Sequence, residues 1–430
     1  MEIDTLKRII REQEETIKSK LAREDIIERE FSGYAAPFLK HPNALAILGI
    51  RRCGKSIFSC MLAGKLSQKP AYINFDDERL AEAKTEDLNK VLQAFYELYG
   101  DPDVIILDEI QNVPGWELFV SRTRETKKVI ITGSNSKMLG GELSTHLTGR
   151  HIDLQLYPFS FREAITFKPD TNLTVDVAKA RNEFKKYVEG SGFPEYRNFG
   201  RSIISSIYED IINKDCIRRY NIKNESTFKE LSRYMISNFS HEFTYSKLSK
   251  IFGIRDIHTT KNYVSYIQEA FLIVIIERYS RSLKQQFIAP RKVYAMDHGL
   301  CNFISFRSDA DLGRMYENIV CTELLRRASA EYGTKIYYWK DHSGKEVDFV
   351  VKKGRSIDAL IQVCYEINAE NIGREAGNLI SAGRELSCKR LIIITDNREG
   401  VETHGDNLIR FVPLWKWLLG LTESPDRQER

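Results

Sequence analysis

The chain has 430 residues, of which 42% are hydrophobic and 29% are charged. This is ordinary globular composition, and it excludes intrinsic disorder over most of the chain. The longest uninterrupted apolar run, Ala270–Ile276, is far shorter than the roughly 20 residues that cross a bilayer, so we expect no membrane partner. At about 150 residues per domain, the length predicts roughly three compact units.

The cysteines argue against a disulfide framework or a zinc site. There are seven, an odd number, and no two have the C-x-x-C spacing. No apolar signal-peptide segment follows the charged residues at the start of the sequence. We therefore expect a cytoplasmic protein.

The first 165 residues predict a helix followed by an α/β core. Residues 1–30 place charges around apolar positions near helical spacing, which indicates an amphipathic helix. Short apolar strands then alternate with helical stretches, a pattern typical of a parallel sheet covered by helices. The candidate strands are Ala44–Leu48, Ala71–Phe75, Val104–Leu107, Val129–Thr132 and Ile152–Leu156.

A phosphate-binding motif directly follows the first of these strands. Residues 49–56 match G-x-x-x-x-G-K-[ST] at every fixed position, and an amphipathic helix comes next. In such a loop, backbone N–H groups and the helix N-terminus bind phosphate, the lysine reaches the β- and γ-phosphates, and the hydroxyl binds magnesium. We therefore predict ATP and Mg²⁺ as cofactors. The predicted nucleotide contacts are Gly49, Ile50, Arg51, Arg52, Cys53, Gly54, Lys55, Ser56 and Ile57.

Polar residues at the ends of later strands supply the other half of the site. Asp108 is expected to hold Mg²⁺ through water, and Glu109 to polarise the attacking water, although Glu109 also fits a surface carboxylate after a strand. Ser134 or Asn135 follows the next strand and is a candidate γ-phosphate sensor. Arg150 is a candidate phosphate contact, within its own subunit or across the boundary of a homo-oligomer; an exposed structural arginine is the alternative.

These motifs and several others carry a family resemblance. The segments concerned are Leu48–Ser56, Leu107–Trp116, Ile131–Ser136, Leu147–Ile152, Tyr157–Glu163, Gly190–Glu195 and Glu346–Phe349. Over nearly its whole length the chain resembles prokaryotic, often archaeal, AAA+-type P-loop ATPases that carry a C-terminal domain of unknown function. The resemblance implies an AAA+-like ATPase core, a winged-helix segment and a restriction-endonuclease-like C-terminal domain.

The expected fold class is therefore α/β, with a P-loop AAA+-like parallel sheet as its core. We divide the chain into an N-terminal helix, the ATPase core, a helical and winged-helix segment, a degenerate restriction-endonuclease-like α/β domain and a tail. Their boundaries are 1–30, 31–165, 166–300, 301–422 and 423–430.

The middle of the chain is basic. Residues 197–295 contain 17 Lys and Arg against 9 Asp and Glu, although the whole chain carries a formal charge of only +4. A helix that ends at Gly253 and a second helix after a short turn suit a helix-turn-helix. Residues near the exposed start of the second helix are expected to contact DNA, namely Arg255, His258, Thr260, Lys261 and Asn262. The alternative is a winged helix that packs against protein or covers the nucleotide.

The C-terminal part has an incomplete nuclease motif. Nucleases of the restriction type need a helix carboxylate, an aspartate at a strand end and E-x-K on the next strand. Glu317 and Asp348 match the first two, but the third reads Gln362-Val-Cys364, without the lysine. Because an amide carbonyl is a poorer Mg²⁺ ligand than a carboxylate, we expect a remnant fold that binds DNA or protein.

The sequence therefore predicts a cytoplasmic ATPase that couples Mg²⁺-ATP hydrolysis to DNA binding or remodelling. Two alternatives remain open at this point. One is a nucleotide-operated signalling switch that binds a protein partner without DNA, and the less favoured one is an ATP-regulated DNA nuclease.

Overall fold

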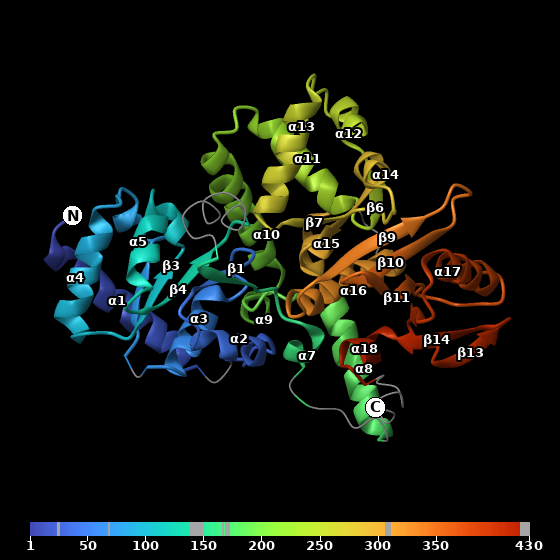
Figure 1. Ribbon diagram of the computed structural model, residues 1–430, viewed down its shortest axis with the longest axis horizontal. Helices are drawn as coiled ribbons and strands as arrows, with labels where there is room; N and C mark the ends of the chain where they lie inside the picture. The colour runs from blue at the N-terminus through green and yellow to red at the C-terminus, as the bar shows by residue number, and fades with distance from the viewer. Residues whose placement is uncertain are drawn as a thin grey trace. The chain divides into compact units, whose positions relative to one another are not determined.

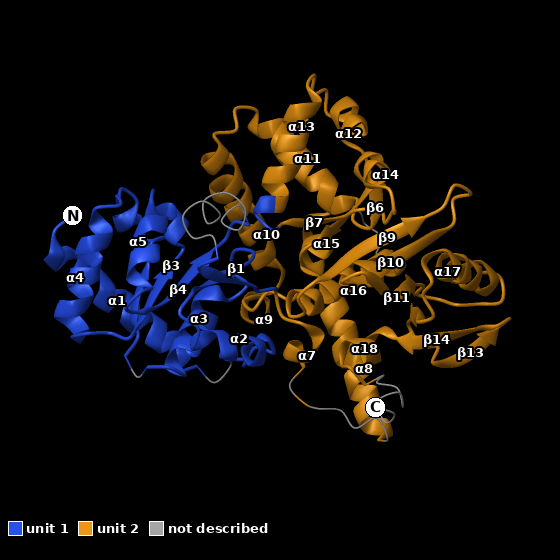
Figure 2. Cartoon of the chain, in the orientation of Figure 1, with its two compact units in different colours: residues 1–157, 269–271 blue, residues 158–268, 272–430 orange. Residues whose placement is uncertain are grey.

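The computed structural model describes residues 1–430 except 24–25, 68, 137–148, 166, 168–172, 306–310 and 422–430. The chain divides into two compact units, which comprise residues 1–157 with 269–271 and residues 158–268 with 272–430 (Figure 1, Figure 2). Both units are α/β, as the sequence predicts. The predicted tail, 423–430, lies outside the described residues.

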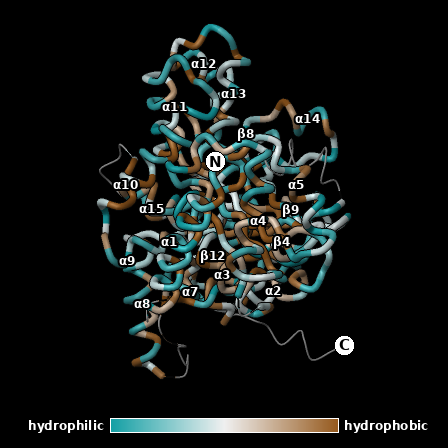
Figure 3. The backbone as a smooth tube through the Cα atoms, turned by 90° about the vertical axis from the view of Figure 1, so that its left-hand side faces the viewer, coloured by the Kyte–Doolittle hydropathy of each residue, from teal (hydrophilic) through white to brown (hydrophobic). Residues whose placement is uncertain are grey.

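Unit 1 is built on a five-stranded parallel sheet with the strand order β2-β3-β4-β1-β5. All five strands lie within one residue of the predicted bounds. They are β1 (Ala44–Leu48), β2 (Ala71–Asn74), β3 (Val104–Asp108), β4 (Lys128–Gly133) and β5 (His151–Gln155). Every residue of β1 and β3 is buried, as in parallel sheets that are covered on both faces. Figure 3 shows hydrophobic backbone at β4 of this sheet.

Helices connect and cover these strands. They are α1 (Ile3–Leu21), α2 (Phe31–Leu39), α3 (Lys55–Gly64), α4 (Asp87–Tyr99) and α5 (Trp116–Thr123), with short 3₁₀ turns at Glu78–Leu80 and Ile110–Asn112. The predicted N-terminal helix forms as α1, and it buries Leu6, Ile9, Ile10 and Ile17. These residues recur at helical spacing, so α1 has one apolar face that packs on α4 and β2.

Unit 2 begins with helices and a small antiparallel sheet. A helix, a strand, two helices and two strands follow one another, and the sheet order is β6-β8-β7. These elements are α11 (Glu225–Ser237), β6 (His241–Phe243), α12 (Tyr245–Ile251), α13 (Ile257–Glu269), β7 (Ile273–Ile276) and β8 (Arg291–Ala295). A short helix, α14 (Leu283–Ile288), connects β7 to β8. Strands β7 and β8 coincide with two apolar stretches of the sequence, Leu272–Glu277 and Lys292–Met296.

A six-stranded mixed sheet completes unit 2, with the order β13-β14-β12-β11-β10-β9. Its strands are β9 (Thr334–Lys340), β10 (Glu346–Lys353), β11 (Ser356–Val363), β12 (Leu391–Thr395), β13 (Gly400–His404) and β14 (Asn407–Pro413). Helix α16 (Leu312–Ser329) contacts β9 and β11, and α17 (Ile372–Leu386) contacts β10, β11 and β12. The sequence analysis missed the hairpin of β13 and β14, whose first strand is largely exposed and lacks an apolar alternation.

The remaining helices of unit 2 surround these two sheets. They are α7 (Phe161–Ala164), α8 (Thr174–Glu189), α9 (Tyr196–Phe199), α10 (Arg201–Asp210), a π-helical continuation of α10 (Ile211–Arg218), α15 (His298–Ile304) and α18 (Leu414–Leu418). Within the described part of the chain, no helix has the length and apolar character that a membrane span requires.

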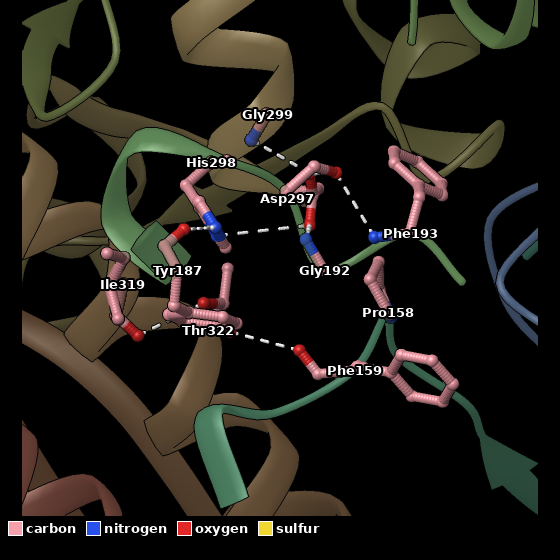
Figure 4. A network of polar contacts seen from close by, with 12 residues as sticks. Pro158, Phe159, Tyr187, Gly192, Phe193, Asp297, His298, Gly299, Ile319 and Thr322 are labelled. Atoms are coloured by element: carbon pink, nitrogen blue, oxygen red, sulfur yellow. Dashed lines mark hydrogen bonds and ion pairs between the residues drawn. The ribbon is translucent and has the colours of Figure 1, made fainter. Parts of the chain in front are cut away.

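A buried carboxylate joins distant segments of unit 2 (Figure 4). Asp297 accepts hydrogen bonds from the Ser191 hydroxyl (2.6 Å) and from the backbone N–H groups of Gly192 (2.9 Å) and Gly299 (2.8 Å). A Cβ on Gly192 would lie 2.7 Å from the carbonyl oxygen of Phe159, so only glycine fits there. The segments around residues 191 and 297 are therefore held together by one buried acceptor, and the backbone N–H of Phe159 joins them by donating to the carbonyl oxygen of Gly192 at 2.6 Å.

Replacing this acceptor tests its contribution to stability. Asp297→Ala should lower the free energy of unfolding by roughly 3 kcal/mol, because three buried donors lose their acceptor. Urea unfolding followed by circular dichroism measures the change. Glu370→Ala, which removes an exposed carboxylate of the same unit, is the control. Equal unfolding midpoints for the two variants would contradict the prediction.

Candidate functional site

The loop between β1 and α3 depends on glycine at two positions. Gly54 has a φ of 101°, in the left-handed region that favours glycine. A Cβ on Gly49 would lie 2.1 Å from the carbonyl oxygen of Leu156, so any side chain there would displace the end of the neighbouring β5 segment. These constraints bring the loop backbone to the carboxyl edge of the sheet, ahead of the N-terminus of α3.

A buried arginine supports the same loop from outside the motif. Arg29 is 5% exposed and donates to the carbonyl oxygens of Cys53 (3.0 Å) and Tyr157 (2.6 Å). The sequence analysis missed it, since a single arginine in a charged segment carries no pattern. Ile50 and Cys53 are fully buried, so their predicted contact with a nucleotide can use only the backbone. Arg51 pairs with Asp76 at 2.8 Å.

The P-loop lysine lies against the acidic pair. The Nζ atom of Lys55 is 3.2 Å from Glu109 Oε1 and donates to the carbonyl oxygen of Gly49 at 3.0 Å. Burial lowers the pKa of Lys55, but the negative charges of Glu109 and Asp108 have a larger opposite effect. The pKa of Lys55 therefore lies above its ordinary value. The ammonium group is therefore charged although its side chain is only 4% exposed.

Asp108 and Glu109 have opposite electrostatic environments. Burial, with the charge of Glu109 added, raises the pKa of Asp108. Asp108 accepts hydrogen bonds from the hydroxyl groups of Tyr72 (2.7 Å) and Thr132. Burial also raises the pKa of Glu109, but Lys55 and Arg51 outweigh it and lower the pKa to about 2. Adjacent carboxylates thus differ in their tendency to ionise, because only Glu109 has the lysine as its direct partner.

The predicted sensor residue reaches the same carboxylate. The backbone N–H of Ser134 donates to Glu109 Oε2 at 3.2 Å, and Gln111 Nε2 donates to that oxygen at 2.6 Å. Glu109 has a φ of 51°, an uncommon conformation for a residue other than glycine and one that is concentrated at functional sites. The structure therefore brings Lys55, Asp108, Glu109 and Ser134 together. Asn135 is buried beside Ser134 in the chain.

Ser56 and Ile57 follow the lysine at the start of α3. The Ser56 side chain lowers the pKa of Asp108, as expected if the two predicted magnesium ligands lie near each other. The interactions of Tyr72, Thr132 and Gln111 were missed by the sequence analysis. Each of these three residues is polar and lies inside or shortly after a buried strand, and this position was the signal that could have identified it.

Arg150 lies at the other edge of the sheet. Its carbonyl oxygen accepts from the N–H of Ala44, the first residue of β1, whereas the P-loop follows the last residue of β1. Five residues of strand separate these ends by about 16 Å. Arg150 Nη1 donates to the hydroxyl of Ser121 at 3.1 Å. Within unit 1, Arg150 therefore lies at the edge of the sheet opposite the P-loop, and its contact with a phosphate across a subunit boundary stays a prediction.

Most of the predicted DNA contacts are exposed in unit 2. The exposed ones are Arg255, His258, Lys261 and Asn262. Thr260 is the exception, because its side chain is completely buried. It lies on one face of α13 with the buried Val264 and Ile267, at helical spacing. The prediction that Thr260 contacts DNA is therefore wrong.

A hollow of about 580 Å³ lies beside the exposed side of α13. Lys261, Asn262, Tyr245, Phe287 and Arg291 are among the residues that line it. Two cations face the same ring, since Lys261 Nζ lies 5.8 Å and the Arg291 guanidinium carbon 5.3 Å from the centre of the Tyr245 ring. The hollow thus combines two positive charges with aromatic surface.

The predicted nuclease-remnant residues lie close together in unit 2. Glu317 of α16 and Asp348 of β10 are both buried. Gln362 of β11 accepts a hydrogen bond from the backbone N–H of Asp348 through its Oε1 atom, at 3.3 Å. The same centre contains Lys292 of β8, which is 3% exposed and therefore adds nothing to the basic surface inferred from the charge count.

Three family models match the chain. One describes an AAA domain and matches residues 41–165, a second a domain of unknown function (DUF8612) at residues 181–311, and a third a domain of unknown function (DUF4143) at residues 312–417. One of the solved structures that the chain matches is the Walker-type ATPase PABY2304 of Pyrococcus abyssi. It has 15% identity and a TM-score of 0.43, over 66% of this chain and 97% of that chain. Another is Cdc6p of Pyrobaculum aerophilum, at 14% identity and a TM-score of 0.26 over 60% and 90%.

Two relatives match along nearly the whole chain. The uncharacterized protein MJ1544 of Methanocaldococcus jannaschii is 32% identical over 403 residues, which cover 88% of this chain and 89% of the relative. An uncharacterized protein of Haemophilus influenzae is 28% identical over 419 residues, which cover 94% and 99%. The chain therefore belongs to the family of MJ1544, whose members combine an AAA-type P-loop domain with the C-terminal domain of unknown function DUF4143.

Proposed function

We propose that the protein binds Mg²⁺-ATP at the loop of residues 49–56 and hydrolyses it. The observation that carries this proposal is the convergence of Lys55, Asp108, Glu109 and Ser134 at the carboxyl edge of the unit 1 sheet. Ser56 and Asp108 are the residues that would hold the metal ion. Bound there, Mg²⁺ supplies positive charge that neutralises the phosphate oxygens during phosphoryl transfer.

The ion pair of Lys55 and Glu109 links phosphate binding to the basicity of the Glu109 carboxylate. Lys55 is the main cause that lowers the pKa of Glu109. A phosphate group that attracts Lys55 weakens this pair, so the pKa of Glu109 rises and the carboxylate becomes a better proton acceptor. Gln111 and the backbone of Ser134 keep hold of the other carboxylate oxygen. Glu109 then stays oriented while Lys55 turns to the phosphate.

We also propose that the nucleotide state controls DNA binding by α13 and the sheet that follows it. The order of α11, β6, α12, α13, β7 and β8 is that of a winged helix, and α13 exposes Arg255 and Lys261. The hollow beside α13 offers cations and an aromatic ring, which suit phosphate and sugar groups.

A direct link in the chain supports this coupling. Residues 269–271, at the end of α13, belong to unit 1. Within unit 1 the backbone N–H of Ser136 donates to the carbonyl oxygen of Glu269 at 2.8 Å. Ser136 lies two residues after Ser134, whose own N–H contacts Glu109. A change at Glu109 can therefore reach the last residue of α13 through a short stretch of backbone.

Lys55→Ala should abolish ATP binding, because it removes the charge that contacts the β- and γ-phosphates. Isothermal titration calorimetry with ATP and Mg²⁺ measures this. Lys65→Ala is the matched control, since Lys65 follows the same helix and pairs with Glu28 on the surface. Micromolar ATP affinity in Lys55→Ala would remove the loop from the proposal.

Glu109→Gln should bind ATP as tightly as the wild type but turn it over roughly 10²- to 10⁴-fold more slowly, because the amide cannot accept the proton of water. Steady-state phosphate release measures the rate. Glu125→Gln, an exposed change in the same unit, should have no effect. An unchanged rate in Glu109→Gln would place the base elsewhere.

Lys261→Ala should weaken duplex DNA binding and reduce the slope of log affinity against log salt concentration by about one, as expected when one phosphate contact is lost. Fluorescence anisotropy at several salt concentrations measures both. The control is Lys389→Ala, an exposed lysine before β12. Wild-type protein that retains no DNA at low salt, with ATP turnover indifferent to DNA, would favour a switch that binds protein instead.

A further inference from the structure

A lysine lies between the buried carboxylates of unit 2. Lys292 comes from β8, in the three-stranded sheet. Its Nζ atom lies 2.9 Å from Glu317 Oε1, 2.7 Å from Glu346 Oε1 and 3.0 Å from Asp348 Oδ1. An ammonium group has three protons, so one proton is available for each carboxylate.

Each carboxylate has a further donor. Glu317 Oε1 accepts from the Tyr294 hydroxyl at 2.6 Å, and Asp348 Oδ2 accepts from the backbone N–H of Val363 at 3.0 Å. Glu346 Oε2 lies 2.9 Å from Lys340 Nζ. Lys340 in turn contacts Glu242 of β6 at 2.9 Å. The cluster is therefore a connected network of hydrogen bonds and ion pairs around one central cation.

A divalent cation does not fit this centre. The resemblance to restriction-type nucleases implies Mg²⁺ at Glu317 and Asp348, but Lys292 Nζ already bridges their oxygens. Mg²⁺ requires near-octahedral oxygen ligands at 2.0–2.1 Å, and Gln362 Oε1 is occupied by the backbone N–H of Asp348. Among the described residues, no group of three acidic, histidine or cysteine side chains is placed to hold a metal ion.

The electrostatics of the cluster agree with a resident ammonium ion. Burial lowers the pKa of Lys292, but Glu317, Asp348 and Glu346 raise it well above the ordinary value, so the lysine stays charged. Burial and then Asp348 raise the pKa of Glu317 to about 7 against the opposing effect of Lys292. Without the lysine, mutually repelling carboxylates would remain in a buried site.

We propose that Lys292 is the permanent cation of this carboxylate cluster: its ammonium group takes the place of a divalent metal ion, fastens β8 to α16 and β10, and leaves the six-stranded sheet without nuclease activity. This inference goes beyond the proposed ATPase, because it gives the carboxylate cluster a structural role, which is to hold β8 against α16 and β10. The lysine missing from the E-x-K position is thus present in space, but all its protons are used by carboxylates.

Mn²⁺ binding to the full-length protein tests whether a metal uses the centre. Titrations of the wild type and of Asp348→Asn, without nucleotide, should give the same isotherm. Lys292→Ala should gain one Mn²⁺ site, and Lys292→Ala/Asp348→Asn should lose it again. A Mn²⁺ site in the wild type that disappears in Asp348→Asn would overturn the proposal.

Thermal unfolding tests the lysine as a counter-ion and remains informative if Lys292→Ala folds poorly. Lys292→Met should lower the melting temperature of unit 2 by about 10 °C, because it leaves buried carboxylates without their cation. Neutralising the partners in Lys292→Met/Glu317→Gln/Asp348→Asn should recover much of that loss. Lys247→Met, on an exposed lysine of α12, is the control. A Lys292→Met protein as stable as the wild type would contradict the proposal.

A DNA cleavage assay is the third test of the proposal. The wild type with Mg²⁺ or Mn²⁺ should cut neither linear nor branched DNA. The proposal would be overturned if the wild type cleaved DNA with a metal ion, Lys292→Ala did not, and Lys55→Ala still did. Lys292 would then serve a nuclease, and the proposal for the ATPase site would be unaffected. Loss of ATP turnover in Lys55→Ala is a separate readout, so the two proposals fail independently.

Discussion

Lys55 and Glu109 form a buried ion pair at the carboxyl edge of a parallel sheet, and the candidate site is organised around it. A buried ammonium group needs an anionic partner, because burial alone would remove its charge. The partner, Glu109, follows β3, which β4 separates from β1, and the strand order β3-β4-β1 brings both residues to the same edge of the sheet. Gly49, Gly54 and Arg29 then fix the loop that carries the lysine. The arrangement of the site thus follows from the need to pair the buried ammonium group of Lys55 with a carboxylate.

The buried lysine of unit 2, Lys292, is paired with negative charge in a different way. Lys55 has one carboxylate, which follows β3, and two carbonyl oxygens of its own loop as partners. Lys292 has three carboxylates from α16 and β10. A competing phosphate can replace the single carboxylate of Lys55, whereas no single ligand replaces the three partners of Lys292. The first lysine is therefore suited to exchange partners and the second to hold a structure together.

Two motifs that carry the family resemblance have a structural explanation. The segments Tyr157–Glu163 and Gly190–Glu195 meet near Asp297, which accepts from Ser191 and Gly192 (Figure 4). Ser160 caps α7 and forms a reciprocal pair of hydrogen bonds with Glu163. The specific sequence of these segments reflects close backbone packing and a buried acceptor, so a distinctive motif need not mark catalysis.

Features that depend on local pattern could be predicted from the order of the residues alone. Five apolar strands, a complete phosphate-binding motif after the first and an acidic pair after the third predicted a parallel core with converging polar ends, since parallel strands share an edge. Local pattern did not reveal which face of α13 is buried, and the packing of this helix excludes Thr260 from the surface. The fold also separates Arg150 from the P-loop of its own chain and places Lys292 among carboxylates that lie 25 to 56 residues away. The physical reason is that motifs are short-range, whereas burial and long-range ion pairs depend on which elements pack together.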